Sequence, residues 1–144
     1  SWVKEYPSVL TFRYFWEDSL PHSGAVFIRR SCFKGNIYQY DESLKIVADW
    51  KWFLIGIFKE GYSYLLIDKI IGIFDYGKGI SSTPANWTLL LEEKETVLKT
   101  EFKYLYSEIK ALNDFQNKYV GIVNSRYFKV CFKVRSWINK IFRR

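Results

Sequence analysis

The chain has 144 residues, of which 49% are hydrophobic and 26% are charged, and its net charge is +7. This composition predicts a folded core and excludes a wholly disordered chain. The two cysteines, Cys32 and Cys131, lie far apart and there is one histidine, which argues against a zinc site and against a disulfide framework. A reducing, cytoplasmic setting is therefore expected. No apolar run approaches the roughly 20 residues that cross a bilayer.

Aromatic residues make up 20% of the chain, and methionine is absent. Aromatic rings supply large burial energies and also form the walls of sugar-binding sites, so their abundance fits either role. Because a natural gene product normally begins with methionine, we expect that upstream coding sequence is missing or has been removed. The opening residues do not have the pattern of a signal peptide.

In the first third of the chain, apolar, β-branched and aromatic residues predict short strands at 8–12 and 24–28. Ser31 is expected to cap a short helical turn through Phe33. Residues 40–43 then form a polar loop.

The stretch 46–60 has apolar residues at three- and four-residue spacing, which predicts one face of a helix. These residues are Val47, Trp50, Phe53, Leu54, Ile57 and Phe58. Gly61 stands where a left-handed cap would end that helix.

Residues 62–74, rich in Ile, Leu and Tyr, predict one or two strands, and residues 75–84 a glycine- and serine-rich loop. Thr83 or Asn86 is expected to cap a helix that runs to about residue 112, with a break near Asn113 and Asp114. Together these elements predict an α/β domain over residues 1–112, with a short mixed sheet and packed helices, followed by a tail over 113–144.

The tail carries the excess charge. Residues 119–144 contain seven basic and no acidic residues, so the rest of the chain is close to neutral. Apolar residues recur between them at helical spacing, and Trp137 stands near the end, which predicts a cationic amphipathic helix suited to an anionic bilayer surface. The alternative is a helix that packs its apolar stripe on the rest of the protein, and the sequence leaves both open.

Four motifs occur in order along the chain: residues 20–30 (LPHSGAVFIRR), 40–44 (YDESL), 46–53 (IVADWKWF) and 79–81 (GIS). Together they resemble the second half of the family 2 inverting glycosyltransferases, in particular bacterial enzymes of cell-surface polysaccharide synthesis. The resemblance covers roughly residues 7–112 and depends on the order and spacing of the motifs, since each alone is weak. It implies an incomplete domain of the GT-A fold.

In that family the acidic residue of the third motif deprotonates the acceptor, so the resemblance implies that Asp49 is the catalytic base. Inverting transfer is a one-step displacement at the anomeric carbon, and a carboxylate within hydrogen-bond reach of the acceptor hydroxyl can take its proton. A position at a helix N-terminus stabilises the carboxylate anion. The alternative is that Asp49 only caps the helix that begins there.

The resemblance also suggests binding roles for other residues of the motifs, each with a plainer alternative. His22 would lie near the acceptor or the diphosphate, or else serve as a structural hydrogen-bond partner, and Trp50 would stack on a sugar face, or else pack in the core. Arg29 would contact phosphate, or else face solvent, and Asp41 and Glu42 would surround the site, or else form a plain turn. Ser81 would belong to a loop that closes over the donor.

The family binds its nucleotide-sugar donor through a divalent metal, Mg or Mn, held by a D-x-D motif, which this chain lacks. The resemblance therefore implies a fragment without its nucleotide-binding half, inactive alone, whose complete enzyme transfers a sugar to a saccharide or lipid-linked acceptor. Nucleic acid is not an expected partner, because the body of the chain is neutral. A non-catalytic module that binds nucleic acid or membrane through the tail is the alternative function, and a structural interaction domain a third.

Overall fold

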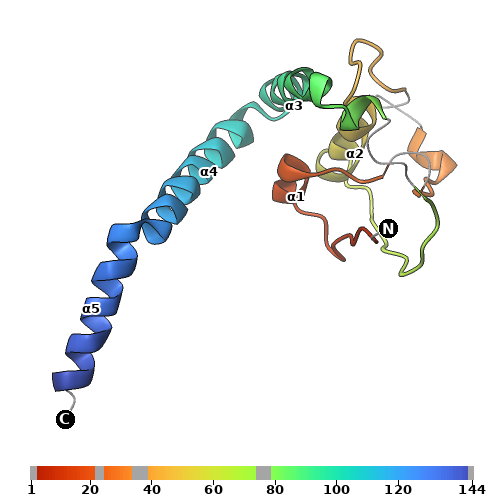
Figure 1. Ribbon diagram of the computed structural model, residues 1–144. Coiled ribbons are helices and arrows are strands. Elements are labelled where there is room, and N and C mark those ends of the chain that lie inside the picture. The colour runs from red at the N-terminus through yellow and green to blue at the C-terminus, as the bar shows by residue number, and fades with distance from the viewer. Residues whose placement is uncertain (1–2, 22–24, 34–38, 74–78, 143–144) are drawn as a thin grey trace. The chain divides into compact units, whose positions relative to one another are not determined.

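The computed structural model describes residues 3–21, 25–33, 39–73 and 79–142 (Figure 1). The chain divides into two compact units, residues 1–102 and 103–144. The boundary thus falls between Phe102 and Lys103, ahead of the one expected after Leu112.

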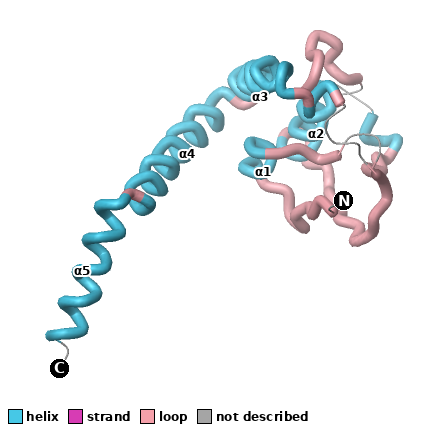
Figure 2. The backbone as a smooth tube through the Cα atoms, in the orientation of Figure 1, coloured by secondary structure: helices cyan, strands magenta, loops and turns pink. Residues whose placement is uncertain are grey.

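Throughout the described residues the secondary structure is helical, without a strand (Figure 2). The predicted α/β class with its short mixed sheet is therefore wrong. The first unit contains α1 (Phe12–Glu17), η1 (Arg30–Phe33), α2 (Ala48–Phe58), η2 (Ile80–Ser82), η3 (Pro84–Asn86) and α3 (Trp87–Glu101).

The described parts of the predicted strands are loops, except that Phe12 begins α1. A high β propensity measures how well side chains fit a pleated, half-buried surface, so it needs a neighbouring strand to take effect. No such neighbour pairs with residues 62–73 within the described chain, and Leu65 is 83% and Ile73 100% exposed. Residues 62–73 have the composition of a strand, but the described part of the chain contains no sheet that they could join.

Helix α2 forms the core of the first unit. It lies within the predicted span, and Gly61 follows it with a φ of 69°, as expected of the left-handed cap. The sequence predicts one apolar face, yet five consecutive residues, 52–56, are all buried, so the helix is enclosed on every side over that turn. Trp50, 2% exposed, donates a hydrogen bond from Nε1 to the carbonyl oxygen of Phe15 in α1 at 2.9 Å.

The segment that leads into α2, residues 45–47, is held by a side chain of another helix. Val47 at the N-cap position has no side-chain hydrogen bond to offer. Instead the buried carboxylate of Glu93 in α3 accepts three backbone N–H groups, from Lys45 at 2.8 Å, Ile46 at 3.0 Å and Val47 at 3.2 Å. A negative charge at this place also suits the positive end of the helix dipole.

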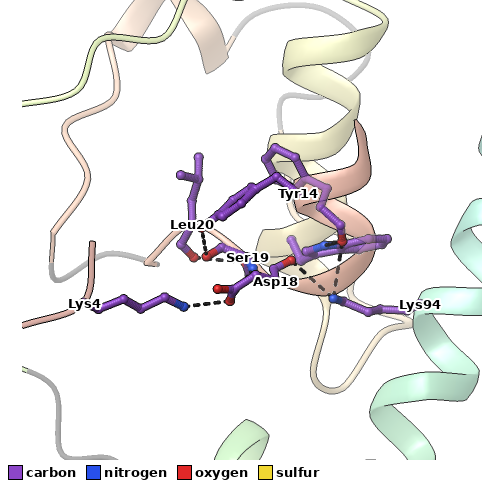
Figure 3. A network of polar contacts seen from close by, with 8 residues as sticks. Lys4, Tyr14, Asp18, Ser19, Leu20 and Lys94 are labelled. Atoms are coloured by element: carbon purple, nitrogen blue, oxygen red, sulfur yellow. Dashed lines mark hydrogen bonds and ion pairs between the residues drawn. The ribbon is translucent and has the colours of Figure 1, made fainter. Parts of the chain in front are cut away.

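The end of α1 is held by the next residue of α3, Lys94 (Figure 3). Its Nζ donates to the carbonyl oxygens of Phe15 at 3.4 Å and Asp18 at 3.3 Å, and lies 4.9 Å from the centre of the Trp50 ring. Burial lowers the pKa of Lys94 to about 8. The Asp18 carboxylate, for its part, accepts hydrogen bonds from Lys4 Nζ at 2.7 Å and Ser19 N at 2.8 Å.

The caps predicted for α3 do not form. Asn86 is the N-cap residue without a side-chain cap bond, and its Nδ2 donates to the carbonyl oxygen of Ile80 at 2.9 Å. The hydroxyl of Thr83 donates to the carbonyl oxygen of Gly79 at 2.9 Å. These two side chains therefore stabilise the segment that precedes α3 through the carbonyl groups of Gly79 and Ile80, and they do not cap the helix.

The second unit consists of α4 (Lys103–Asn124) and α5 (Arg126–Phe142). Helix α4 runs through Asn113 and Asp114, where a break was predicted. Ser125 separates the two helices and caps α5, since its Oγ accepts the N–H of Phe128 at 3.2 Å. None of the side chains described in this unit is buried.

Replacing Glu93 with Ala should lower the free energy of unfolding by about 2–3 kcal/mol, because three backbone N–H groups lose their acceptor. Urea denaturation measures the change. The exposed neighbour Glu92 supplies the control, since Glu92→Ala should stay within about 0.5 kcal/mol of the parent. Equal effects of the two substitutions would refute the capping role.

Because of Lys94, the free energy of unfolding should increase as the pH rises from about 8 toward 10. The pKa of Lys94 is about 8 in the folded chain against an ordinary value of 10.5, so the unfolded chain binds more protons in this interval. Burial raises the pKa of Tyr14, so its ionisation acts in the opposite direction only near pH 10 and above. Urea denaturation across this pH range should show the rise in the parent and its loss in Lys94→Met. A rise that persists in the variant would assign it to another group.

Candidate functional site

A hollow of about 460 Å³ lies beside α2 in the first unit. Its wall comes from α2, from the segment before it and from the last residue of α3. The lining residues are Gln39, Asp41, Ala48, Lys51, Trp52, Ile55, Lys59, Glu60 and Glu101.

Charges of alternating sign run along this wall. Lys51 Nζ lies 2.7 Å from Asp41 Oδ2 and 3.2 Å from Glu101 Oε1, while Lys59 Nζ lies 2.6 Å from Glu101 Oε2. Burial lowers the pKa of Lys51, but its hydrogen bonds to Asp41 and Glu101 outweigh burial and raise it overall. The pKa of Glu101 is lowered, first by its hydrogen bond from Lys59. Lys51 and Glu101 are therefore both charged at neutral pH.

Asp41 joins the loop at 40–43 to α2. Its Oδ1 accepts hydrogen bonds from Ser43 N at 3.0 Å and Ser43 Oγ at 2.6 Å, which makes a tight turn. Its other oxygen binds Lys51. The hydrogen bond from Lys51, followed by those from Ser43, lowers the pKa of Asp41 to about 2.

The aromatic part of the wall is Trp52, which is 5% exposed. Its ring stacks on Phe33, with centroids 5.1 Å apart and planes at 27°, and meets the rings of Tyr40, Phe53 and Tyr62 at centroid distances of 6.4, 5.4 and 6.1 Å. An indole edge beside carboxylate oxygens and ammonium groups offers both apolar and hydrogen-bonding contacts to a small polar ligand.

Asp49 stands in the first turn of α2, half-buried, beside the hollow and not among its lining residues. Its Oδ1 accepts the backbone N–H of Trp50 at 2.7 Å. Burial, and then the charge of Asp49, raises the pKa of Tyr40, whose ring in turn meets Trp52.

The other predicted site residues are not gathered at the hollow, apart from Asp41. Trp50 is part of the core, where its ring has no face open to a sugar. Glu42, Arg29 and Ser81 are exposed and do not line the hollow; Arg29 precedes η1 and not a strand, and Ser81 lies in η2. His22 lies outside the described residues.

Sequence reasoning missed Lys51 and Glu101 as residues of the site, and it left open which of Trp50 and Trp52 would face a sugar. Lys51 and Trp52 belong to the third motif, so a signal for them was at hand. Glu101 had none, because it reaches Lys51 and Lys59 only through the packing of α3 on α2.

No cluster of three or more histidine, cysteine, aspartate or glutamate side chains that could hold a metal occurs among the described residues. Three carboxylates line the hollow, those of Asp41, Glu60 and Glu101. Two of them, Asp41 and Glu101, are already paired with ammonium groups, and these ion pairs disfavour a divalent metal at the same oxygens.

Within the described ranges, no helix combines the length and the apolar character that crossing a membrane requires.

Comparison of the chain with protein-family models, with curated proteins and with solved structures found no match.

The ion pair between Asp41 and Lys51 should show in the acid side of the stability profile. The pKa of Asp41 is about 2 in the folded chain against an ordinary 3.8, so the unfolded chain takes up the proton first as the pH falls. The free energy of unfolding should therefore fall from about pH 4 to pH 2, and less steeply in Lys51→Gln. Urea denaturation at several pH values tests this, with the exposed Lys69→Gln as control. Parallel curves for all three proteins would contradict the pairing.

Proposed function

We propose that this chain is the acceptor-side part of an inverting glycosyltransferase, which transfers a sugar from a nucleotide-sugar donor to a saccharide or lipid-linked acceptor. The observation that carries the proposal is the order and spacing of the four motifs at residues 20–30, 40–44, 46–53 and 79–81. The structure contributes independent support from the placement of the second and third of these motifs.

The second and third motifs meet at one hollow. Asp41 of the YDESL segment is paired with Lys51 of the IVADWKWF segment at 2.7 Å, and both line the hollow with Trp52. A saccharide has many hydroxyl groups, so the charged side chains of Asp41, Lys51 and Glu101 suit it as hydrogen-bond partners, whereas Trp52, 5% exposed, contributes little open ring surface. We assign the acceptor saccharide to this hollow.

Asp49 is the proposed base. As the acceptor hydroxyl attacks the anomeric carbon, its proton passes to the Asp49 carboxylate, the new glycosidic bond forms, and the bond to the nucleoside diphosphate breaks with inversion. The half-buried side chain at the start of α2 retains an oxygen, Oδ2, beyond the one that accepts the Trp50 N–H. Asp49 does not line the hollow itself, so the acceptor would have to extend toward the start of α2 for its hydroxyl to reach this carboxylate.

Donor binding is assigned to a part of the enzyme outside this chain, because the sequence contains no D-x-D motif. A divalent metal held there would neutralise charge on the leaving diphosphate. An exposed apolar segment of the first unit fits a covering partner, since Leu65, Ile70 and Ile73 are 83%, 74% and 100% exposed. The chain alone would therefore lack transferase activity.

Asp49→Asn in the enzyme that includes the donor-binding part should lower kcat by at least about 100-fold, the usual loss when a general base is removed. Asn keeps a side-chain oxygen for the Trp50 N–H, so the thermal unfolding midpoint and donor affinity should change little. Steady-state transfer assays and donor titration measure the two effects.

Two further variants separate catalysis from helix capping. Asp49→Ala loses both roles and should be inactive and less stable, whereas Asp68→Asn, an exposed aspartate outside the motifs, should remain active and stable. Two results together would contradict the proposal: full turnover in Asp49→Asn, and a loss of stability in Asp49→Ala alone. Asp49 would then cap the helix and have no part in the mechanism.

A further inference from the structure

Helix α5 exposes large apolar and basic side chains together. The exposed apolar residues whose side chains are described are Tyr127, Phe128, Val130, Phe132, Val134 and Trp137, from 41% at Phe128 to 87% at Tyr127. The exposed basic residues among them are Arg126, Lys129, Lys133 and Arg135. Water is a poor environment for so many apolar side chains on a single helix, which indicates that something covers them.

Three of the four exposed basic residues gather in a narrow stripe, whereas Arg135, three positions after Phe132, lies on the opposite side of the helix among the aromatic residues. Arg126, Lys129 and Lys133 are three and four positions apart, so they share one side of the helix. Tyr127, Val130, Val134 and Trp137 recur at the same spacing and form an apolar strip along one border of that stripe. The rings of Phe128 and Phe132 stack at a centroid distance of 6.5 Å and lie along its other border. The apolar sector is therefore wider than the basic one.

We propose that α5 binds an anionic lipid surface, lying along it with its apolar sector at the acyl boundary and its basic stripe at the headgroups. The chain has no acidic residue after Asp114, so charge repulsion from the lipid is absent along the whole helix. Trp137 is the type of side chain that prefers the boundary between headgroup and acyl chain. This proposal does not depend on the transferase assignment.

Two other occupants fit less well. A nucleic acid would engage the basic residues through its phosphates, but Val130 and Val134 would gain nothing from phosphates or from base stacking. A second α5 helix would place its basic stripe against the basic stripe of the first, and the like charges would repel each other. No acidic residue on α5 could pair with them. Of these three partners, a lipid surface is the one that uses both sectors.

The charge arm of the test uses the full 144-residue chain with phosphatidylcholine vesicles, with and without phosphatidylglycerol, in co-sedimentation. The double variant Lys129→Gln and Lys133→Gln should bind the anionic vesicles about 25-fold more weakly, at about fivefold for each basic residue. Lys45→Gln with Lys69→Gln removes the same charge from exposed positions of the first unit and should retain the parent affinity. Equal losses in both pairs would assign binding to net charge alone and overturn the proposal.

The apolar arm keeps every charge. Val130→Gln with Val134→Gln should weaken binding to the anionic vesicles by about tenfold or more, since two side chains lose their place in the lipid. If this variant binds the vesicles and a single-stranded oligonucleotide as well as the parent does, the basic stripe is a general polyanion site and the proposal fails. Circular dichroism should show unchanged helix content, because both residues are exposed.

The fluorescence of Trp137 shows directly whether its side chain reaches the acyl chains of the lipid. Lipids with brominated acyl chains should quench part of the tryptophan fluorescence of the chain, and Trp137→Phe should remove most of the quenched fraction, leaving the five other tryptophans. Quenching that is the same in the variant would show that Trp137 is not in the lipid, against the proposal.

Discussion

Two neighbouring residues of α3 hold the ends of the two other principal helices of the first unit. Glu93 accepts three backbone N–H groups at the start of α2, and Lys94 donates to two carbonyl oxygens at the end of α1. Each charge has the sign that the helix end requires, negative at an N-terminus and positive at a C-terminus. Because Val47 offers α2 no polar side chain, the start of α2 is set by α3.

The same face of α3 also shapes the hollow. Glu93, Val97 and Glu101 are four residues apart, so they lie on one side of the helix and meet α2 in turn. Glu93 binds the backbone just before α2, Val97 is 3% exposed, and Glu101 pairs with Lys51 of α2 and with Lys59, which caps its end. The register of α3 against α2 thus fixes the position of Asp49 and of the charged wall together.

Local pattern predicted α2 and its cap well, because apolar spacing and Gly61 are properties of the helix itself. It predicted a sheet wrongly, because residues 62–74 resemble a strand only if another strand lies beside them. For the site, Asp41 could be named from its motif, yet spacing does not say that Trp50 and Trp52 are both buried. Glu101 depends on tertiary packing alone, for which the sequence carries no local signal.

The two units use their aromatic and charged residues in opposite ways. In the first, Phe15, Trp50 and Trp52 are buried, and the charges along the hollow are paired with one another. In the second, aromatic rings are exposed beside basic residues that have no acidic counterpart on α5. An anionic surface would therefore attract the basic residues of α5, whereas it would leave the ion pairs along the hollow unchanged.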